Sequence, residues 1–104
     1  MIVEQRVYTI KTLKMPEYLA YYRDHGLSIQ EEILGNPVGF FTTEVGALNQ
    51  VTLMWGYASQ GDREQRREKL LKDPRWQAYM ENLPPLIERQ ENRILVPTDF
   101  SPIR

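Results

Sequence analysis

The sequence predicts an α+β fold, a ferredoxin-like βαββαβ sandwich in which helices cover one face of an antiparallel sheet. Two observations lead to this prediction. Runs rich in β-branched and aromatic residues alternate with stretches of helical periodicity, in the order strand, helix, strand, strand, helix, strand. The length of 104 residues fits one domain, so we expect a single domain over residues 1–104.

The first third of the chain predicts one strand and one helix. Residues 2–10 (IVEQRVYTI) are rich in Val, Ile, Thr and Tyr, which favour a strand. Pro16, at a first helical position, begins a helix that we expect to run to about Leu34, where the Gly35–Pro37 segment ends it. Gly26 lies inside this helix and costs about 1 kcal/mol relative to Ala, which favours a break there.

The middle of the chain predicts a hairpin followed by a capped helix. Residues 38–45 and 49–58 have strand composition, and a short turn at residues 46–48 joins them. Ser59 is a typical N-cap residue, and an acidic residue follows three positions later, as in a capping box. We expect the helix that begins here to run to about Lys72.

The last third of the chain predicts a helix and a short final strand. Asp73 and Pro74 form a second helix start, with Asp as the cap and Pro in the first turn. This helix ends before Pro84, and a short helical segment is expected over residues 86–89. Residues 93–96 (RILV) are expected to form the last strand.

Composition and charge exclude several function classes. Thirteen basic and 14 acidic residues give a net charge of −1, which argues against nucleic-acid binding. The absence of Cys and the single His leave no thiolate or His-rich metal site, so we expect no metal and no cofactor. No apolar stretch approaches the length of a membrane span or a signal peptide, so we expect a soluble, cytoplasmic protein.

The third predicted strand has apolar bulk on both of its faces. Its two alternate sets are Val51, Leu53, Trp55 and Tyr57 on one face, and Gln50, Thr52, Met54 and Gly56 on the other. Helices cover one face only, so the other face needs another cover. A second copy of the chain is the simplest one, because twofold dimers are the commonest soluble assemblies, and we expect a homodimer formed through the sheet face.

Five motifs spread over nearly the whole chain are E-x-R-x-Y at residues 4–8, GN-x-VGFF-x-TE-x-G-x-LNQV at 35–51, W-x-Y-x-S at 55–59, R-x-x-R at 63–66 and DP-x-W at 73–76. Their joint spacing resembles the NIPSNAP family. The resemblance implies a dimeric α/β barrel, in which two ferredoxin-like sandwiches pack sheet to sheet. The family is linked to vesicle trafficking and mitochondria, but its name carries no settled biochemical activity.

One position departs from the pattern that the resemblance implies. Members of the family often have His where this chain has Leu53. Chemistry that depends on that imidazole is therefore not expected here.

The candidate ligand-binding residues are Glu4, Arg6, Tyr8, Trp55 and Tyr57. The first and third strands of a ferredoxin-like sheet are central neighbours, and we expect these side chains to face the barrel interior, with the valines of the first strand facing the helices. Arg6 would bind a ligand carboxylate or enolate, Glu4 would hold Arg6 or act as a base, and the aromatic rings would pack on an apolar body.

The sequence is compatible with two functions. One is a small-molecule site in the barrel, used for binding or for cofactor-independent oxygenase or isomerase chemistry. The other is a non-enzymatic dimeric protein-interaction module, in which Glu4 and Arg6 form a structural ion pair and the aromatic residues form dimer core. No catalytic residue is assigned. A well-formed pocket that contains Arg6 and an aromatic residue would favour the first function.

Three further features are interpreted as structural. His25, the sole imidazole, lies on a helix between polar neighbours and is expected at the surface. The basic stretch over residues 63–75 is interleaved with acidic residues at i,i+4 spacing, which is typical of a solvated helix. Trp76, Tyr79 and Met80 have helical spacing and are expected to pack in the core.

Overall fold

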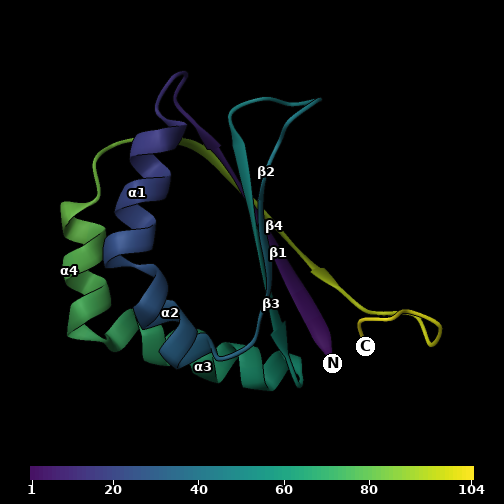
Figure 1. Ribbon diagram of the computed structural model, residues 1–104. Helices are drawn as coiled ribbons and strands as arrows, with labels where there is room; N and C mark the ends of the chain where they lie inside the picture. Colours follow the sequence, from purple (N-terminus) through teal and green to yellow (C-terminus); the bar gives the residue numbers. More distant parts are fainter.

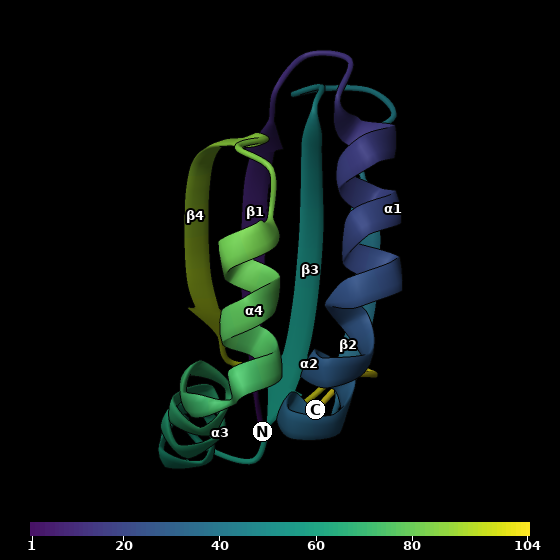
Figure 2. The same cartoon turned by 90° about the vertical axis from the view of Figure 1, so that its left-hand side faces the viewer.

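The computed structural model describes all 104 residues and contains a four-stranded antiparallel sheet with four helices on one face (Figures 1 and 2). The elements are β1 (Ile2–Ile10), α1 (Met15–His25), α2 (Leu27–Leu34), β2 (Pro37–Thr42), β3 (Gln50–Tyr57), α3 (Gln60–Lys72), α4 (Pro74–Asn82) and β4 (Ile87–Leu95). The strand order is β2-β3-β1-β4, with β1 and β3 in the centre. The expected ferredoxin-like α+β arrangement is confirmed.

The first helical region is broken at Gly26, as its sequence predicts. The amide of Gly26 still donates to the carbonyl of Tyr22, and the carbonyl of Gly26 accepts from Gln30, so helical hydrogen bonding runs through the break. A Cβ atom at this position would lie 2.7 Å from Cε1 of Tyr79 on α4. The glycine therefore allows the α1–α2 junction to approach α4 closely.

The two predicted helix caps are confirmed. Oγ of Ser59 accepts from the amide of Asp62 at 3.1 Å, and Oδ2 of Asp62 accepts from the amide of Ala58 at 3.1 Å. Oδ1 of Asp73 accepts from the amide of Arg75 at 2.8 Å, and the Arg75 side chain lowers the pKa of Asp73 to about 2. The caps at the starts of α3 and α4 thus supply acceptors for backbone amides that have no partner within the helix.

The last strand is longer than its composition predicts. Residues 87–95 form β4, so the helical segment expected over residues 86–89 is wrong. The polar sequence of this strand lacks apolar alternation, but its backbone pairs with β1 from Val3 to Ile10. Main-chain pairing to a central strand outweighs the weak local preference.

The hairpin strands are shorter than predicted, and a longer connection over residues 43–49 joins them.

The orientation of β1 differs from the expected one. Glu4, Arg6 and Tyr8 point toward the helices, whereas Val3 and Val7 point to the other face. The register shows this, because the first three lie opposite Trp55, Leu53 and Val51, which belong to the core between sheet and helices. Trp55 and Tyr57 also belong to this core, so the barrel-facing placement of all five candidate residues is wrong.

No helix covers the second face of the sheet (Figure 1). Residues 96–104 follow β4 on this side and extend away from the helical layer (Figure 1). Val96, Pro97 and Ile103 line a shallow groove over Val3 and Met54, at one end of this face. The longest helix, α3, has 13 residues, and none of the helices has the length and apolar character that crossing a membrane requires.

The Gly26–Tyr79 approach gives a stability prediction. Gly26→Ala is expected to destabilise the protein by about 1–3 kcal/mol, because the added Cβ overlaps the Tyr79 ring, although Ala is the better helix former. Gly61→Ala is the matched control, since a Cβ there meets nothing closer than Ser59 at 3.8 Å, and it is expected to stabilise α3 by about 0.5–1 kcal/mol. Urea denaturation measures both, and equal effects of the two variants would contradict the prediction.

Candidate functional site

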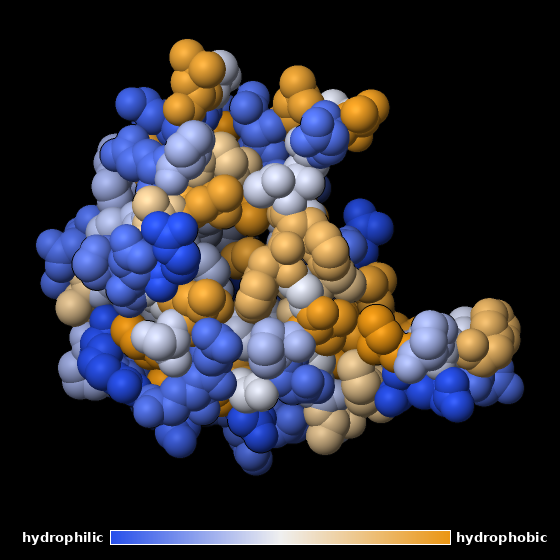
Figure 3. Space-filling view, viewed as in Figure 1, coloured by the Kyte–Doolittle hydropathy of each residue, from blue (hydrophilic) through white to orange (hydrophobic).

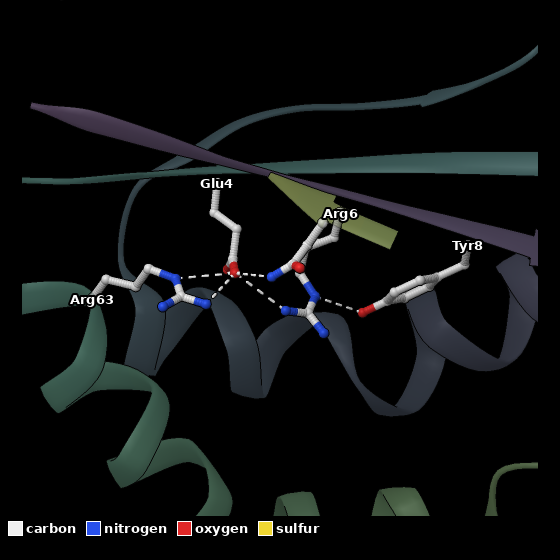
Figure 4. Close-up of polar contacts among 5 residues, drawn as sticks. Glu4, Arg6, Tyr8 and Arg63 are labelled. Atoms are coloured by element: carbon white, nitrogen blue, oxygen red, sulfur yellow. Dashed lines mark hydrogen bonds and ion pairs between the residues drawn. The ribbon is translucent and has the colours of Figure 1, made fainter. Parts of the chain in front are cut away.

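A buried carboxylate, Glu4, is the centre of the polar cluster beneath the helices (Figure 4). Its side chain has no exposed surface, and its Oε2 accepts four hydrogen bonds. Arg63 of α3 donates from Nη2 at 2.5 Å and from Nε at 3.0 Å. Arg6 of β1 donates at 3.2 Å, and Asn92 of β4 donates at 3.1 Å. One oxygen atom thus connects a central strand, an edge strand and a helix.

The surroundings of Glu4 keep it ionised. Burial raises the pKa of a carboxyl group, but here the Arg63 hydrogen bonds and the charge of Arg6 outweigh burial, and the pKa of Glu4 is lowered. The same partners satisfy the charge that burial takes out of water. Glu4 is therefore a buried anion that its neighbours hold in place.

Arg6 is fixed from two sides. Its Nη1 donates to Glu4, and its Nε donates to the Tyr8 hydroxyl at 2.8 Å (Figure 4). The guanidinium carbon also lies 5.6 Å from the centroid of the Tyr8 ring, within the range of a cation–π contact. These contacts leave the guanidinium with a defined orientation before any ligand binds.

Beside Arg6 lies a cavity of about 120 Å³ between the sheet and the helices. Aromatic rings supply much of its wall. Tyr18 meets Tyr8 edge-on at 6.5 Å and stacks on Tyr22 at 6.2 Å, and Trp76 stacks on Tyr79 at 4.7 Å. Such a wall suits the flat or apolar part of a small molecule.

The polar part of the wall is small. Arg6, Arg67, Gln30 and Gln90 supply it, and Gln30 accepts a hydrogen bond from the Tyr22 hydroxyl at 2.5 Å. Hydrophilic side chains cover much of the outer surface of the helices, whereas hydrophobic side chains show between the helices and the sheet (Figure 3). The cavity therefore combines an apolar interior with a few convergent polar groups.

The structure brings together only part of the predicted site. Arg6 and Tyr8 line the cavity, and Glu4 lies behind Arg6 and holds it, as one of the two expected roles for Glu4 requires. Trp55 and Tyr57 are buried in the core and do not line the cavity. Burial, together with the nearby Glu4 charge, raises the pKa of Tyr57 to about 12.

Sequence reasoning missed two arginines of the cluster, Arg63 and Arg67. It treated the whole basic stretch of α3 as solvated, which is correct for the exposed Glu68–Lys72 pair and for the partly exposed Asp62–Arg66 pair. Arg63 and Arg67 instead turn inward, toward Glu4 and the cavity. Their i,i+4 spacing, which places them on one helix face, was the available signal.

The other structural interpretations are confirmed with one exception. His25 is exposed, with its ring 4.9 Å from that of Tyr21. Trp76 and Tyr79 are core residues, and they also line the cavity. Met80 is half-exposed and lines the cavity rather than packing in the core.

The residues of the site do not form a metal centre. Glu4 is the carboxylate of the cluster, and no three His, Cys, Asp or Glu side chains group anywhere in the chain so as to hold an ion. The groups available for chemistry are guanidinium, phenol and amide. They can bind an anion or polarise a carbonyl oxygen.

Comparison with known proteins finds relatives that share one family name. The family model NIPSNAP matches residues 3–102. Protein NipSnap homolog 3A from Homo sapiens is 40% identical over 67 residues, which are 64% of this chain and 27% of that protein. The chain thus spans about a quarter of the length of the curated relatives it matches first.

Solved structures show the same likeness over nearly the whole chain. A NIPSNAP family protein from Agrobacterium tumefaciens is 57% identical, with a TM-score of 0.96 over 99% of this chain and 98% of that one. A putative antibiotic biosynthesis monooxygenase from Nitrosomonas europaea has a TM-score of 0.64 at 16% identity, over 93% of this chain and 98% of that one. The second likeness is one of fold alone.

Removing the charge of Glu4 is expected to destabilise the protein strongly. Glu4→Gln leaves Arg6 and Arg63 buried without their anion, and we expect a loss of about 3 kcal/mol or more in the free energy of unfolding. Glu64→Gln, on the exposed face of α3, is the control and should change little. Chemical denaturation at neutral pH measures both, and a small effect of Glu4→Gln would show that the cluster contributes little.

Glu4 also predicts a pH dependence. Its pKa in the folded protein is below the ordinary 4.5, so its stabilising contribution is complete above about pH 4.5 and is lost as the pH falls through the folded-state pKa. The free energy of unfolding should therefore fall on acidification below that point, and Glu4→Gln should lessen the fall. A pH series of denaturation curves tests this, and parallel acid dependence in the two proteins would refute it.

Proposed function

The chain belongs to the NIPSNAP family, and we propose that it binds a small molecule in the cavity between its sheet and its helices. The observation that carries the proposal is Arg6, a largely buried cation that Glu4 and Tyr8 orient toward an aromatic-lined cavity. Burying a charge is costly, and fixing one at the wall of a cavity is typical of binding sites.

The size of the cavity limits the ligand. Its 120 Å³ is somewhat less than the roughly 150 Å³ of an engineered protein cavity that binds benzene, and well below the roughly 300 Å³ of pockets for drug-sized ligands. Leu71 and Met80, both about half-exposed, lie at its rim and leave one side open. The ligand is therefore a compact molecule of about benzene size, or a larger one with such a group at its end.

The site supports binding better than turnover. Glu4 is the carboxylate that could act as a base, but it lies behind Arg6 and outside the cavity wall, and its Oε2 already accepts four hydrogen bonds. Leu53, at the position where the family resemblance implies a His, forms apolar wall. Without a carboxylate or imidazole in the wall, proton transfer would fall to tyrosine phenols, and burial raises the pKa of Tyr18, Tyr22 and Tyr79, which makes them poor bases at neutral pH.

The proposal extends to a homodimer formed through the uncovered face of the sheet. Val7, Thr52 and Met54 lie on that face and are only partly buried, and no helix covers them. A second copy packed face to face would cover both uncovered faces at once, in the way that the family resemblance implies. The cavity lies on the opposite side of the sheet, so each protomer would keep its own site.

Blocking the rim tests the binding proposal. Native mass spectrometry of the purified protein is expected to detect a retained small molecule. Met80→Trp should abolish retention by filling the rim, while the free energy of unfolding stays within about 0.5 kcal/mol of its original value. Leu48→Trp, exposed in the β2–β3 connection, is the control for adding an indole elsewhere. Equal retention by both variants would place the molecule outside this cavity.

Sedimentation velocity tests the dimer. The protein is expected to sediment at twice its 12.3 kDa chain mass, and Met54→Lys should reduce this to the monomer, since it places a charge in the middle of the interface. Gln65→Lys, on exposed α3, adds the same charge away from that face and should leave the dimer intact. A monomeric parent protein would end this part of the proposal.

A further inference from the structure

The cluster beneath the helices has more positive than negative charge. Glu4 faces three arginines, Arg6, Arg63 and Arg67, and the fourth neighbour, Asn92, is neutral. Glu4 therefore neutralises one of three cations. Such an excess in a poorly solvated place is unfavourable unless an anion from outside the chain completes it.

Arg67 is the arginine for which the chain supplies no partner. Its Nη1 is buried and makes no hydrogen bond, whereas Arg6 and Arg63 both donate to Glu4. Burial and the nearby charge of Arg6 lower the pKa of Arg67, and the attraction of Glu4 does not offset them. The chain thus holds a buried donor for which it supplies no acceptor, at a cost that a bound acceptor would remove.

The position of Arg67 shows where that acceptor would lie. Arg67 follows Arg63 by one turn of α3 and lines the cavity together with Arg6. Glu4 is near enough for its charge to act on Arg67, yet no hydrogen bond joins the two, and Oε1 of Glu4 is itself without a partner. Arg67 is therefore a residue of the cavity wall with a donor that neither Glu4 nor any other group of the chain pairs.

We propose that Arg6 and Arg67 together bind the carboxylate of a small organic acid, with its apolar body against Tyr18, Tyr22 and Trp76. This inference rests on the proposed function and names its ligand class. Guanidinium groups match carboxylate geometry through paired N–H donors, and two cations converging on one cavity favour an anion over a neutral isostere. The size of the cavity limits the acid to a compact body, such as a short branched chain or a single ring.

Matched pairs of acid and amide test the inference. Isothermal titration calorimetry at neutral pH compares isobutyrate with isobutyramide and benzoate with benzamide, so that only the charge of the head group changes. We expect each acid to bind roughly tenfold or more tightly than its amide, because only the acid supplies acceptors for both guanidinium groups.

Variants at Arg67 separate binding from structure. Arg67→Met should weaken acid binding roughly tenfold or more, leave amide binding unchanged and leave the midpoint of thermal unfolding unchanged or higher, since it removes a buried unpaired donor. Arg67→Lys should retain part of the preference for acids. Lys69→Met, exposed on the same helix, removes one charge outside the cavity and should leave all affinities unchanged.

The outcomes distinguish this inference from the proposed function. If acids and amides bind equally well, the anion site is refuted and the cavity remains a binding site. If neither series binds, the proposed function fails and the anion site fails with it. If Arg67→Met lowers the unfolding midpoint and leaves acid binding intact, Arg67 has a structural role and the inference is overturned.

Discussion

The carboxylate of Glu4 is the interaction on which the rest of the structure depends. A charge without any exposed surface is tolerated only when its surroundings replace water, and here Arg6, Arg63 and Asn92 do so. These partners come from β1, α3 and β4, so the position of one oxygen atom fixes two strands and a helix relative to one another. The same contacts set the orientation of Arg6 at the cavity wall.

Arg6 lies at the boundary between two parts of the layer that the sheet and the helices enclose. On one side of Arg6 lies its ion pair with Glu4, which Arg63 shares, and on the other lies the cavity with its aromatic wall. Trp55, Leu70 and the other fully buried core residues fill much of the rest of this layer. The hydrogen bonds that stabilise the fold and the groups that a ligand would meet are therefore parts of one arrangement.

Local signals in the sequence were sufficient for much of the fold. The caps at Ser59 and Asp73, the break at Gly26 and the order of the elements depend on residues close together in the chain, and all are confirmed. Strand β4 was largely missed, because its pairing with β1 joins segments about 85 residues apart and depends on the backbone rather than on side-chain type.

The candidate site was only partly predictable for a related reason. Alternation along β1 shows that Glu4, Arg6 and Tyr8 share a face, but it does not show which side of the sheet that face meets. The decisive contact is with Arg63, 59 residues away, whose helix was interpreted as solvated. Polar residues turned inward because partners from a distant element satisfied them, and a single strand cannot reveal such partners.

The two outer strands of the sheet restrict how the molecule can associate with itself. An exposed strand edge can pair with another chain, and such growth leads to fibres or aggregates. Strand β2 has six residues and begins at Pro37, and its register shifts before Gly39, so it is a poor template. Strand β4 is longer, but Arg89, Glu91 and Arg93 place alternating charges along it. Both edges thus oppose open-ended growth by strand pairing.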